Sequence, residues 1–404
     1  METVIVGGGA AGCYAAVFSA RRGDSVTLLE PNGRVGKKLG ITGKGRCNVT
    51  NNCDLDTLMK NITRNPSFLY SAFSRFGTGE CMSFFEELGV PLKTERGGRV
   101  FPVSDKAADI VNALDKELKR LKVNAAAQRA LEVVVENGAV TGVRTEQRII
   151  SADKVILATG GMSYPATGST GDGYRIAERL GHTVTMLSPS LVPMETVESC
   201  GDMAGLTVKN CVFTLLDMKT GKKLFSELGE MCFENYGIAG PLTLSASSHI
   251  DKFEYGRYRV SIDLKPALDD KKLDSRILRE ISAAPSKRAF ELVRTLVPQK
   301  LVKAVLDRAG VSADKKSAEL SKACRLDIGR VLKNFELELK GFRPIREAII
   351  TDGGISVKEI SPSDMQSKIV SGLHFAGEII DVSAFTGGFN LQIAFATAGA
   401  ASGV

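Results

Sequence analysis

The first thirty residues constrain the fold more than any other part of the chain. Residues 4–6 form a short β-branched run typical of a buried parallel strand, and the glycine-rich segment 7–12 follows at once. We expect a helix over 13–22, then a second strand over 26–29 that ends at the acid Glu30. This order of strand, glycine loop, helix, strand and acid predicts an α/β dinucleotide-binding domain of the Rossmann type.

Each part of this G-x-G-x-x-G fingerprint has a physical role in binding a dinucleotide. The first glycine permits a tight turn, the second lets the backbone approach a pyrophosphate, and the third lets helix and strand pack closely. Unpaired N–H groups at the helix start attract phosphate, and the acid can accept hydrogen bonds from a ribose. The predicted cofactor contacts are Gly7, Gly9, Ala10, Ala11, Gly12 and Glu30.

A second loop rich in glycine and basic residues, 33–51, favours a flavin over a simple nicotinamide cofactor. A flavin dinucleotide lies extended, so a second loop must cover its pyrophosphate, ribityl chain and ring. A Walker loop is excluded because its spacing requires glycine at position 38, which is lysine. A solvated basic loop is the alternative. The predicted contacts here are Lys38, Gly43, Gly45, Arg46, Cys47 and Asn48.

Two of these residues have alternative roles. Arg46 could bind the cofactor pyrophosphate or polarise a substrate carbonyl, and we favour the cofactor role. Cys47 could be a redox thiol, but no partner cysteine lies nearby in the sequence, so a small packing residue is favoured. Eight cysteines without a CxxC pair predict free thiols, and with only three histidines no metal site is expected.

Later segments of the chain also predict contacts with this cofactor. Residues 154–158 predict a buried strand followed by glycines, and residues 373–376 predict another strand that leads to acids. A glycine pair then opens the final helix, whose N-terminus can stabilise negative charge on a reduced flavin. Asp381 is assigned to the ribityl hydroxyls. The predicted contacts are Ala158, Thr159, Gly160, Gly377, Asp381, Gly387, Gly388, Phe389 and Asn390.

On these residues the chain resembles the YhiN/BaiN-like family of FAD-dependent oxidoreductases, some of them described as aminoacetone-oxidase-like. The matching segments are the opening fingerprint and residues 41–51, 98–102, 158–173 and 372–390, so the resemblance spans essentially the whole chain. It implies an α/β fold: a glutathione-reductase-type FAD-binding Rossmann domain with an inserted small β-barrel and an inserted helical subdomain. The FAD is expected to be non-covalent.

The expected domains follow from this resemblance and from local patterns. Residues 1–190 and 345–404 form the discontinuous FAD-binding domain, 191–267 and 331–344 the barrel-like domain, and 268–330 the helical subdomain. The barrel strands are expected over 208–216, 222–225, 231–233 and 258–264, and the helices break at Pro285, Pro298 and Gly310. Residues 190–345 contain no second glycine fingerprint, so NAD(P)H would bind only transiently, or the reductant is another compound.

Charge is concentrated in the helical subdomain. The whole chain has a net charge of +7, and residues 268–330 hold 15 Lys+Arg against 9 Asp+Glu, a difference of +6. Its single aromatic residue is Phe290, and its basic residues alternate with acids. A solvated helical face is therefore favoured over a nucleic-acid surface, which stays the alternative.

Candidates for acid–base catalysis are few. Tyr164, in a glycine-rich loop beside a cofactor strand, could donate a proton, with a packing role as the alternative. In the family a Thr-His pair usually precedes the Gly-Ile-Ser-Gly-Pro turn, but Glu234-Asn235 stands there in this chain. Glu234 and Tyr236 are the local acid–base candidates in its place, and the proton donor stays open.

The resulting hypothesis is an FAD-dependent oxidoreductase acting on a small or medium organic substrate. Hydride transfer through flavin N5, with NAD(P)H as reductant and a conjugated enone or dienone as substrate, is favoured. The alternatives are a flavin amine oxidase and a non-catalytic, RNA-associated flavoprotein that docks through the basic helices. No signal sequence or membrane span is evident, so a cytoplasmic protein is expected. The substrate and the oligomeric state stay open.

Overall fold

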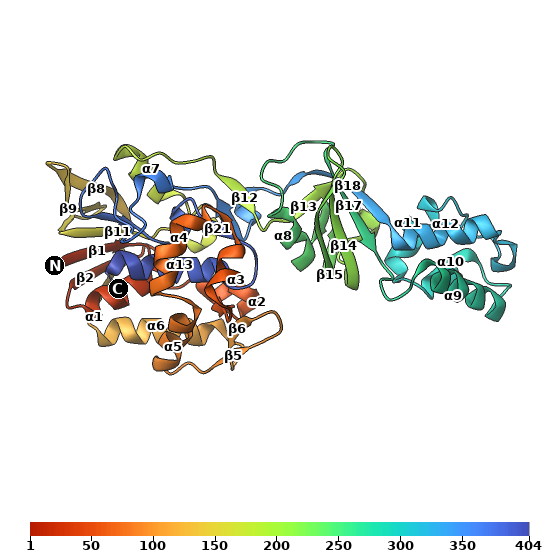
Figure 1. Ribbon diagram of the computed structural model, residues 1–404, viewed down its shortest axis with the longest axis horizontal. Helices are drawn as coiled ribbons and strands as arrows, with labels where there is room; N and C mark the ends of the chain where they lie inside the picture. Colours follow the sequence, from red (N-terminus) through yellow and green to blue (C-terminus); the bar gives the residue numbers. More distant parts are fainter. Residues whose placement is uncertain (404) are drawn as a thin grey trace. The chain divides into compact units, whose positions relative to one another are not determined.

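Two units make up residues 1–403, the part of the chain that the computed structural model describes (Figure 1). Met1–Ser190 and Ile345–Val404 form the first unit, and Leu191–Pro344 form the second. Each unit encloses its own cluster of buried apolar side chains. The first contains a parallel sheet of Rossmann type and the second a closed barrel, so the expected fold class is confirmed.

The central sheet of the first unit is parallel throughout, with strand order β20-β11-β1-β2-β7. Its strands are β1 (Glu2–Val6), β2 (Ser25–Leu29), β7 (Asn124–Ala126), β11 (Lys154–Leu157) and β20 (Leu373–Phe375). All four residues of β11 and the last four of β1 are buried, as expected for strands covered on both faces. The carboxyl ends of all five strands meet at one edge of the sheet.

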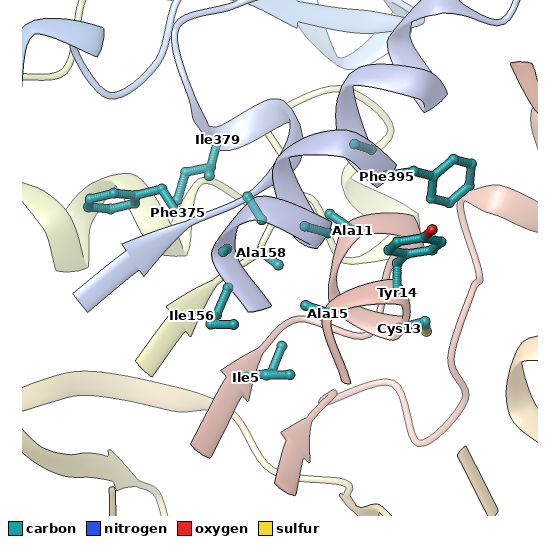
Figure 2. Packing of buried hydrophobic residues seen from close by; sticks show 14 of the residues in the cluster. Ile5, Ala11, Cys13, Tyr14, Ala15, Ile156, Ala158, Phe375, Ile379 and Phe395 are labelled. Atoms are coloured by element: carbon teal, nitrogen blue, oxygen red, sulfur yellow. The ribbon is translucent and has the colours of Figure 1, made fainter. Parts of the chain in front are cut away.

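Helices α1 (Ala10–Arg21) and α13 (Phe389–Ser402) pack together against this sheet, although they come from opposite ends of the chain (Figure 1). Figure 2 shows small side chains of α1, Ala11 and Ala15, beside Ile5, Ile156 and Ala158. Close packing here needs Gly12, because a Cβ atom at this position would lie 1.7 Å from the carbonyl oxygen of Gly7. The fold therefore requires this glycine even before any ligand is considered.

Smaller elements complete the first unit. A three-stranded sheet joins β3 (Thr50–Asn51), β6 (Arg99–Pro102) and β5 (Leu92–Thr94), and an antiparallel meander joins β8 (Ala130–Glu136), β9 (Ala139–Thr145) and β10 (Ile149–Ser151). Two short pairs are β4 (Ile62–Arg64) with β21 (Ser383–Ala384) and β12 (Ser188–Ser190) with β19 (Ile350–Asp352). The remaining helices are α2 (Thr42–Gly45), α3 (Leu55–Lys60), α4 (Pro66–Arg75), α5 (Thr78–Glu87), α6 (Ala107–Arg120) and α7 (Asp172–Arg179).

The barrel of the second unit has strand order β13-β16-β15-β14-β17-β18. Its strands are β13 (Met194–Thr196), β14 (Thr207–Asp217), β15 (Lys222–Glu234), β16 (Gly237–Ala239), β17 (Tyr258–Asp263) and β18 (Phe335–Phe342), with α8 (Pro241–Ser247) after β16. The prediction of separate strands over 222–225 and 231–233 was wrong, because β15 is continuous. Pairing with β14 runs through residues 226–229, so the glycine there does not end the strand.

Four helices form the rest of the second unit, with the expected breaks. They are α9 (Asp270–Ala283), α10 (Ala289–Arg294), α11 (Gln299–Arg308) and α12 (Lys322–Lys333). Pro285 follows α9, Pro298 caps α11 and Gly310 follows it. These helices share one buried core with the barrel. Over residues 1–403, no helix is both long and apolar enough to cross a membrane.

An aromatic cluster in the first unit surrounds a buried hydroxyl. The ring of Tyr14, on α1, lies 4.6 Å from that of Phe84. It lies 5.2 Å from the ring of Phe395, and Figure 2 shows these two rings side by side. The side chain is fully buried, and its hydroxyl has no hydrogen-bond partner among the described residues. Burial raises the pKa of Tyr14, so the hydroxyl stays protonated. An unpaired buried hydroxyl costs about 1–3 kcal/mol of stability.

We therefore expect Tyr14→Phe to stabilise the protein by about 1 kcal/mol, because it keeps the ring contacts and removes the unpaired group. Tyr174→Phe is the matched control, since the buried Tyr174 hydroxyl donates to the carbonyl of Glu378 at 3.4 Å. The control should lower stability slightly. Thermal unfolding of both variants measures the difference, and a larger loss for Tyr14→Phe than for the control would contradict this account.

Candidate functional site

The glycine loop at the end of β1 has the properties of a phosphate cradle. Gly9 is the N-cap residue of α1, no side chain caps this helix end, and its first turn carries no acid. A Cβ atom on Gly9 would meet nothing within 4 Å, so open space lies beside the backbone. The adjacent Thr159 hydroxyl is buried and has no hydrogen-bond partner among residues 1–403. These features fit the pyrophosphate of a bound dinucleotide.

Glu30 directly follows β2, the strand beside β1, and hydrogen bonds hold its side chain in place. One carboxylate oxygen accepts the backbone N–H of Gly8 at 2.9 Å, and the other accepts the backbone and side-chain N–H groups of Asn32 at 2.9 and 2.7 Å. The carboxylate therefore lies against the glycine loop, as its predicted ribose contact requires. That contact itself stays a prediction.

A partly buried polar cluster joins three loops at the same sheet edge. Lys38 forms an ion pair with Glu378 at 2.8 Å and donates to the hydroxyl of Ser163 at 2.7 Å. The Glu378 carboxylate also accepts from that hydroxyl at 2.9 Å and from the backbone N–H of Thr351 at 2.8 Å. Burial alone raises the pKa of Glu378, but the Lys38 ammonium and these hydrogen bonds outweigh it, so the pKa lies below its usual value.

Glu378 is a site residue that the sequence analysis missed. Its position directly after Gly377, at the turn that follows β20, is the signal for it in the sequence, where Asp381 is the predicted acid of this segment. Glu378 lies against the glycines after β11, since a Cβ atom on Gly161 would be 3.2 Å from its carboxylate oxygen. Thr351 binds the same glycine segment, accepting the N–H groups of Met162 and Ser163.

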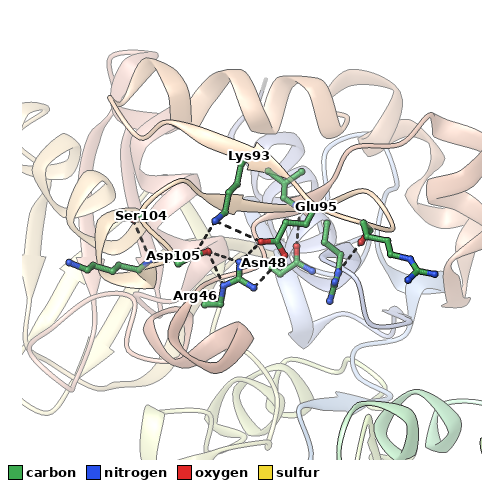
Figure 3. A network of polar contacts seen from close by, with 10 residues as sticks. Arg46, Asn48, Lys93, Glu95, Ser104 and Asp105 are labelled. Atoms are coloured by element: carbon green, nitrogen blue, oxygen red, sulfur yellow. Dashed lines mark hydrogen bonds and ion pairs between the residues drawn. The ribbon is translucent and has the colours of Figure 1, made fainter. Parts of the chain in front are cut away.

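Arg46 is held by two acids in the structure (Figure 3). Its guanidinium binds the carboxylates of Glu95 and Asp105 at 2.5 Å each and stacks over the ring of Phe101 at 4.1 Å. Lys93 binds Asp105 as well, at 2.7 Å. These bonds hold the pKa of Glu95 below its usual value. A contact between Arg46 and a pyrophosphate stays a prediction, and it would require the guanidinium to leave these carboxylates.

The neighbours of Arg46 have structural roles. Cys47 is fully buried, and burial raises the pKa of its thiol to about 12, which fits a packing residue rather than a redox thiol. The side chain of Asn48 accepts the N–H of Val100 at 3.1 Å and ties this loop to β6. Gly43 lies beside Asn48 with φ of +57°, within a left-handed turn.

The loop before α13 is tied to β3. Asn51 donates its side-chain amide to the carbonyl of Gly387 at 3.0 Å. Gly388, the N-cap residue of α13, has φ of +100°, and a Cβ atom there would lie 2.3 Å from the carbonyl oxygen of Thr50. The side-chain oxygen of Asn390 accepts the backbone N–H of Ala384, and its side-chain N–H groups donate to the carbonyls of Ala384 and Phe385. The helix end is thus shaped by backbone contacts, with no side-chain cap over its N–H groups.

Asp381 faces a partner that the sequence analysis did not foresee. Its buried carboxylate binds the guanidinium of Arg64 through both oxygens. Its backbone carbonyl accepts the side-chain amide of Asn65 at 2.6 Å. The assignment of Asp381 to the ribityl hydroxyls stays a prediction, with this ion pair as a competing role.

The three catalytic candidates belong to different units. Tyr164 precedes η2 (Pro165–Thr167) of the first unit, has φ of +53°, is half-buried, and its hydroxyl has no hydrogen bond to a described residue. Glu234 and Tyr236 lie at the turn between β15 and β16 of the second unit. The Tyr236 ring packs under the guanidinium of Arg343 at 4.4 Å. Their catalytic roles stay predictions.

The contribution of the ion pair between Lys38 and Glu378 to folding stability should be measurable in the protein without cofactor. Glu378→Gln leaves a half-buried ammonium uncompensated, so we expect about 1–3 kcal/mol of destabilisation in the apoprotein. Lys38→Met combined with Glu378→Gln should lose less than the sum of the two single variants. Asp115→Asn, which breaks the exposed pair with Lys119, should change stability by less than about 0.5 kcal/mol. Additive losses at Lys38 and Glu378 would contradict the coupling.

Gly388→Ala should weaken FAD binding at least about tenfold, because the new methyl group must push α13 away from Thr50. A displaced helix N-terminus would also stabilise reduced flavin less, so the reduction potential of the remaining holoprotein should fall. Gly341→Ala is the control, since a Cβ atom there meets nothing within 4 Å. FAD titration and dye equilibration give both quantities. Wild-type values for Gly388→Ala would place the flavin away from this helix end.

Comparison with known proteins identifies the family. The model of the HI0933-like protein Rossmann domain matches residues 1–404. The chain is 32% identical to the 3-dehydro-bile acid delta(4,6)-reductase of Clostridium scindens, over 97% of this chain and 96% of that protein. It is 30% identical to the ribosomal RNA dihydrouridine synthase of Haemophilus influenzae, over 98% and 96%.

A solved structure shares the fold at low sequence identity. The 3-ketosteroid delta1-dehydrogenase of Sterolibacterium denitrificans aligns with a TM-score of 0.55 and 12% identity, covering 99% of this chain and 98% of that one. The full-length family match and the whole-chain similarity to a named reductase agree with the glycine cradle described above. The chain therefore belongs to the HI0933-like family of FAD-dependent oxidoreductases with a Rossmann-type fold.

Proposed function

We propose that this protein reduces a carbon–carbon double bond conjugated to a carbonyl in a small or medium organic substrate, with NAD(P)H as the reductant of its flavin. The observation that carries the proposal is the 32% identity, over nearly the whole of both chains, with the 3-dehydro-bile acid delta(4,6)-reductase. The substrate class comes from that relative, whereas the cofactor cradle comes from this chain's own residues.

The first unit would hold the cofactor along the sheet edge. The α1 N-terminus fits the pyrophosphate and Glu30 the adenosine ribose, while the cluster of Lys38 and Glu378 lies farther along the edge, beside the glycines after β11. FAD, when bound, supplies hydride transfer. The uncapped N-terminus of α13 would stabilise negative charge on the reduced form.

A second candidate is reduction of a uracil ring in ribosomal RNA. The relative from Haemophilus influenzae that bears this name covers 98% of this chain. Uracil also contains a carbon–carbon double bond conjugated to a carbonyl, so both reductions would act on the same kind of bond. The excess of six basic residues over 268–330 offers an RNA-binding surface. Oxidation of an amine is the remaining alternative, and no contact in the structure favours it.

Anaerobic reduction followed by a panel of oxidants tests these alternatives. NADH or NADPH should bleach the flavin band, and a 3-oxo-4,6-diene steroid should restore it within seconds, whereas unmodified ribosomal RNA should not. Restoration by RNA with no response to the steroid would favour the second candidate. Reduction of the flavin by an amine, with reoxidation by oxygen alone, would contradict both reductase proposals.

A further inference from the structure

A fully buried histidine joins two segments of the first unit. The side chain of His182, in the loop after α7, has no exposed surface, and its Nε2 atom lies 2.8 Å from the hydroxyl of Ser367. The same hydroxyl oxygen accepts the backbone N–H groups of Ile369 at 3.0 Å and Val370 at 2.8 Å. These two bonds use both lone pairs of the oxygen, so the Ser367 proton is donated to Nε2. His182 is therefore neutral, with its own proton on Nδ1.

An acid and an aromatic ring face the other sides of this imidazole. Its Nδ1 atom lies 3.3 Å from Oε2 of Glu359, in η6 (Val357–Glu359). This contact is not aligned as a hydrogen bond, and Nδ1 has no hydrogen-bond partner among residues 1–403. The ring of Phe375 lies edge-on at 4.8 Å. We call His182, Ser367 and Glu359 the histidine cluster.

Serine, histidine and a carboxylate also make up the catalytic triad of many hydrolases. Ser367 is not a nucleophile here, because it is buried and its oxygen already accepts two N–H groups. The histidine cluster is therefore a structural contact, and its strength depends on the charge of His182.

The surroundings of His182 oppose its protonation. Burial lowers the pKa of His182, and the Glu359 carboxylate offsets this effect only in part. An imidazolium would also present a second N–H to the Ser367 oxygen, which has no lone pair left for it. Because an exposed histidine has a pKa of about 6.5, the cluster is fully stable above that pH and is weakened as the pH falls below it. At low pH, opening of the cluster lets the imidazole take up a proton from water.

The other charged groups of these elements do not change charge in the same range. Burial alone raises the pKa of Glu359, but the N–H of Thr183 and the imidazole hold it below its usual value. The pKa of Asp364 is likewise below its usual value, and burial lowers the pKa of His374, on β20, to about 4. Exposed charged side chains on the same elements are Glu178, Arg179, Lys358 and Lys368. Between about pH 5 and about pH 7.5, a change of charge in this region therefore falls on His182.

Backbone hydrogen bonds connect the histidine cluster to the segment that follows β19. Oε2 of Glu359 accepts the N–H of Thr183 at 2.8 Å, and the carbonyl of Thr183 accepts the N–H of Ser356 at 2.9 Å. Two residues farther on, the N–H of Thr185 donates to the carbonyl of Gly354 at 2.9 Å. Opening of the cluster therefore removes a support of this segment.

The same segment binds the loop after β20. Ile355, which is buried, donates its N–H to the carbonyl of Ile379 at 2.9 Å and accepts the N–H of Asp381 at 3.0 Å. The approach is close, because a Cβ atom on Gly354 would lie 2.5 Å from the carbonyl oxygen of Ile379. Glu378, of the polar cluster at the sheet edge, directly precedes Ile379. The loop that carries Glu378 and Asp381 thus depends on contacts that begin at the histidine cluster.

We propose that His182 makes the binding of FAD sensitive to pH. Protonation of its imidazole breaks the hydrogen bond from Ser367, opens the histidine cluster and loosens residues 377–381 at the carboxyl edge of the sheet, where folds of this type bind their ligands. FAD binds the form with neutral His182 more tightly and is therefore released more readily at low pH. Cofactor retention is independent of whether a steroid, a uracil ring or an amine is the substrate.

Hydrogen–deuterium exchange of the wild-type holoprotein tests the path through the structure. Exchange is compared at about pH 5 and about pH 7.5, after correction for the intrinsic effect of pH on amide exchange. Residues 181–185, 354–370 and 377–381 should exchange severalfold faster at the lower pH, whereas β14 and β15 should not change. Faster exchange that stops short of residues 377–381 would overturn the link to the cofactor loop.

The affinity for FAD tests the role of the imidazole itself. Fluorescence titration of the wild-type apoprotein should give a dissociation constant about tenfold larger at about pH 5 than at about pH 7.5, because one proton competes with FAD. His182→Gln offers an acceptor and a donor that do not titrate, so its affinity should change less than about twofold. His249→Gln is the matched control, since His249 is a partly buried histidine of the second unit whose ring packs on Phe225 at 5.2 Å. It should keep the wild-type pH dependence.

A second variant keeps the test decisive if His182→Gln does not fold. Ser367→Ala removes the proton donor to Nε2, so protonation becomes easier and the loss of FAD affinity should begin at a higher pH than in the wild type. A merely structural role of Ser367 would lower the affinity equally at every pH. The wild-type pH dependence in His182→Gln, or an unshifted dependence in Ser367→Ala, would overturn the assignment to His182.

Discussion

The contact between Gly12 and Gly7 is the constraint on which the rest of the first unit depends. It sets how closely α1 approaches β1, because any side chain at Gly12 would enter the carbonyl oxygen of Gly7. This approach places the start of α1 over the sheet edge, between the loops that follow β11 and β20. The loop after β20 also approaches α1 closely, since a Cβ atom on Gly377 would be 2.9 Å from that of Ala11. Three strand ends from distant parts of the sequence thus converge on one helix terminus.

Cations near this edge are held by carboxylates. Lys38 binds Glu378, Arg46 binds Glu95 and Asp105, and Arg64 binds Asp381. Each pairing fixes a long side chain in one position and lowers the local net positive charge. A phosphate at the glycine loop would therefore meet mainly backbone N–H groups and the dipole of α1, whose first turn carries no acid, although Glu30 already accepts the N–H of Gly8. The paired cations serve to place loops and acids.

Two relatives that match nearly the whole of this chain are named for different substrates, a 3-dehydro-bile acid and ribosomal RNA. A single cofactor unit can serve both substrates if the surface that admits the substrate differs. The closed barrel and its helices, which share one core, form a separate unit on which such differences can arise without altering the cofactor cradle.

The sequence by itself determined the cofactor unit, because its signals are local. Short apolar runs followed by glycines, and Glu30 at the end of a strand, fix strand, turn and helix within about thirty residues. The breaks at Pro285, Pro298 and Gly310 are equally local, since proline and glycine limit the backbone wherever they stand. The continuity of β15 was missed because pairing with β14, and not the strand's own composition, carries it through Gly229.

Only the tertiary structure decided which charged residues meet. Lys38 and Glu378 are 340 residues apart, and Arg64 and Asp381 are 317 apart, so no spacing rule connects them. Residue type alone therefore favours Lys38, Arg46 and Asp381 as cofactor contacts and gives no role to Glu378 or Thr351. Which charged residues pair depends on which strands and loops lie side by side, and the packing of the whole unit determines that arrangement.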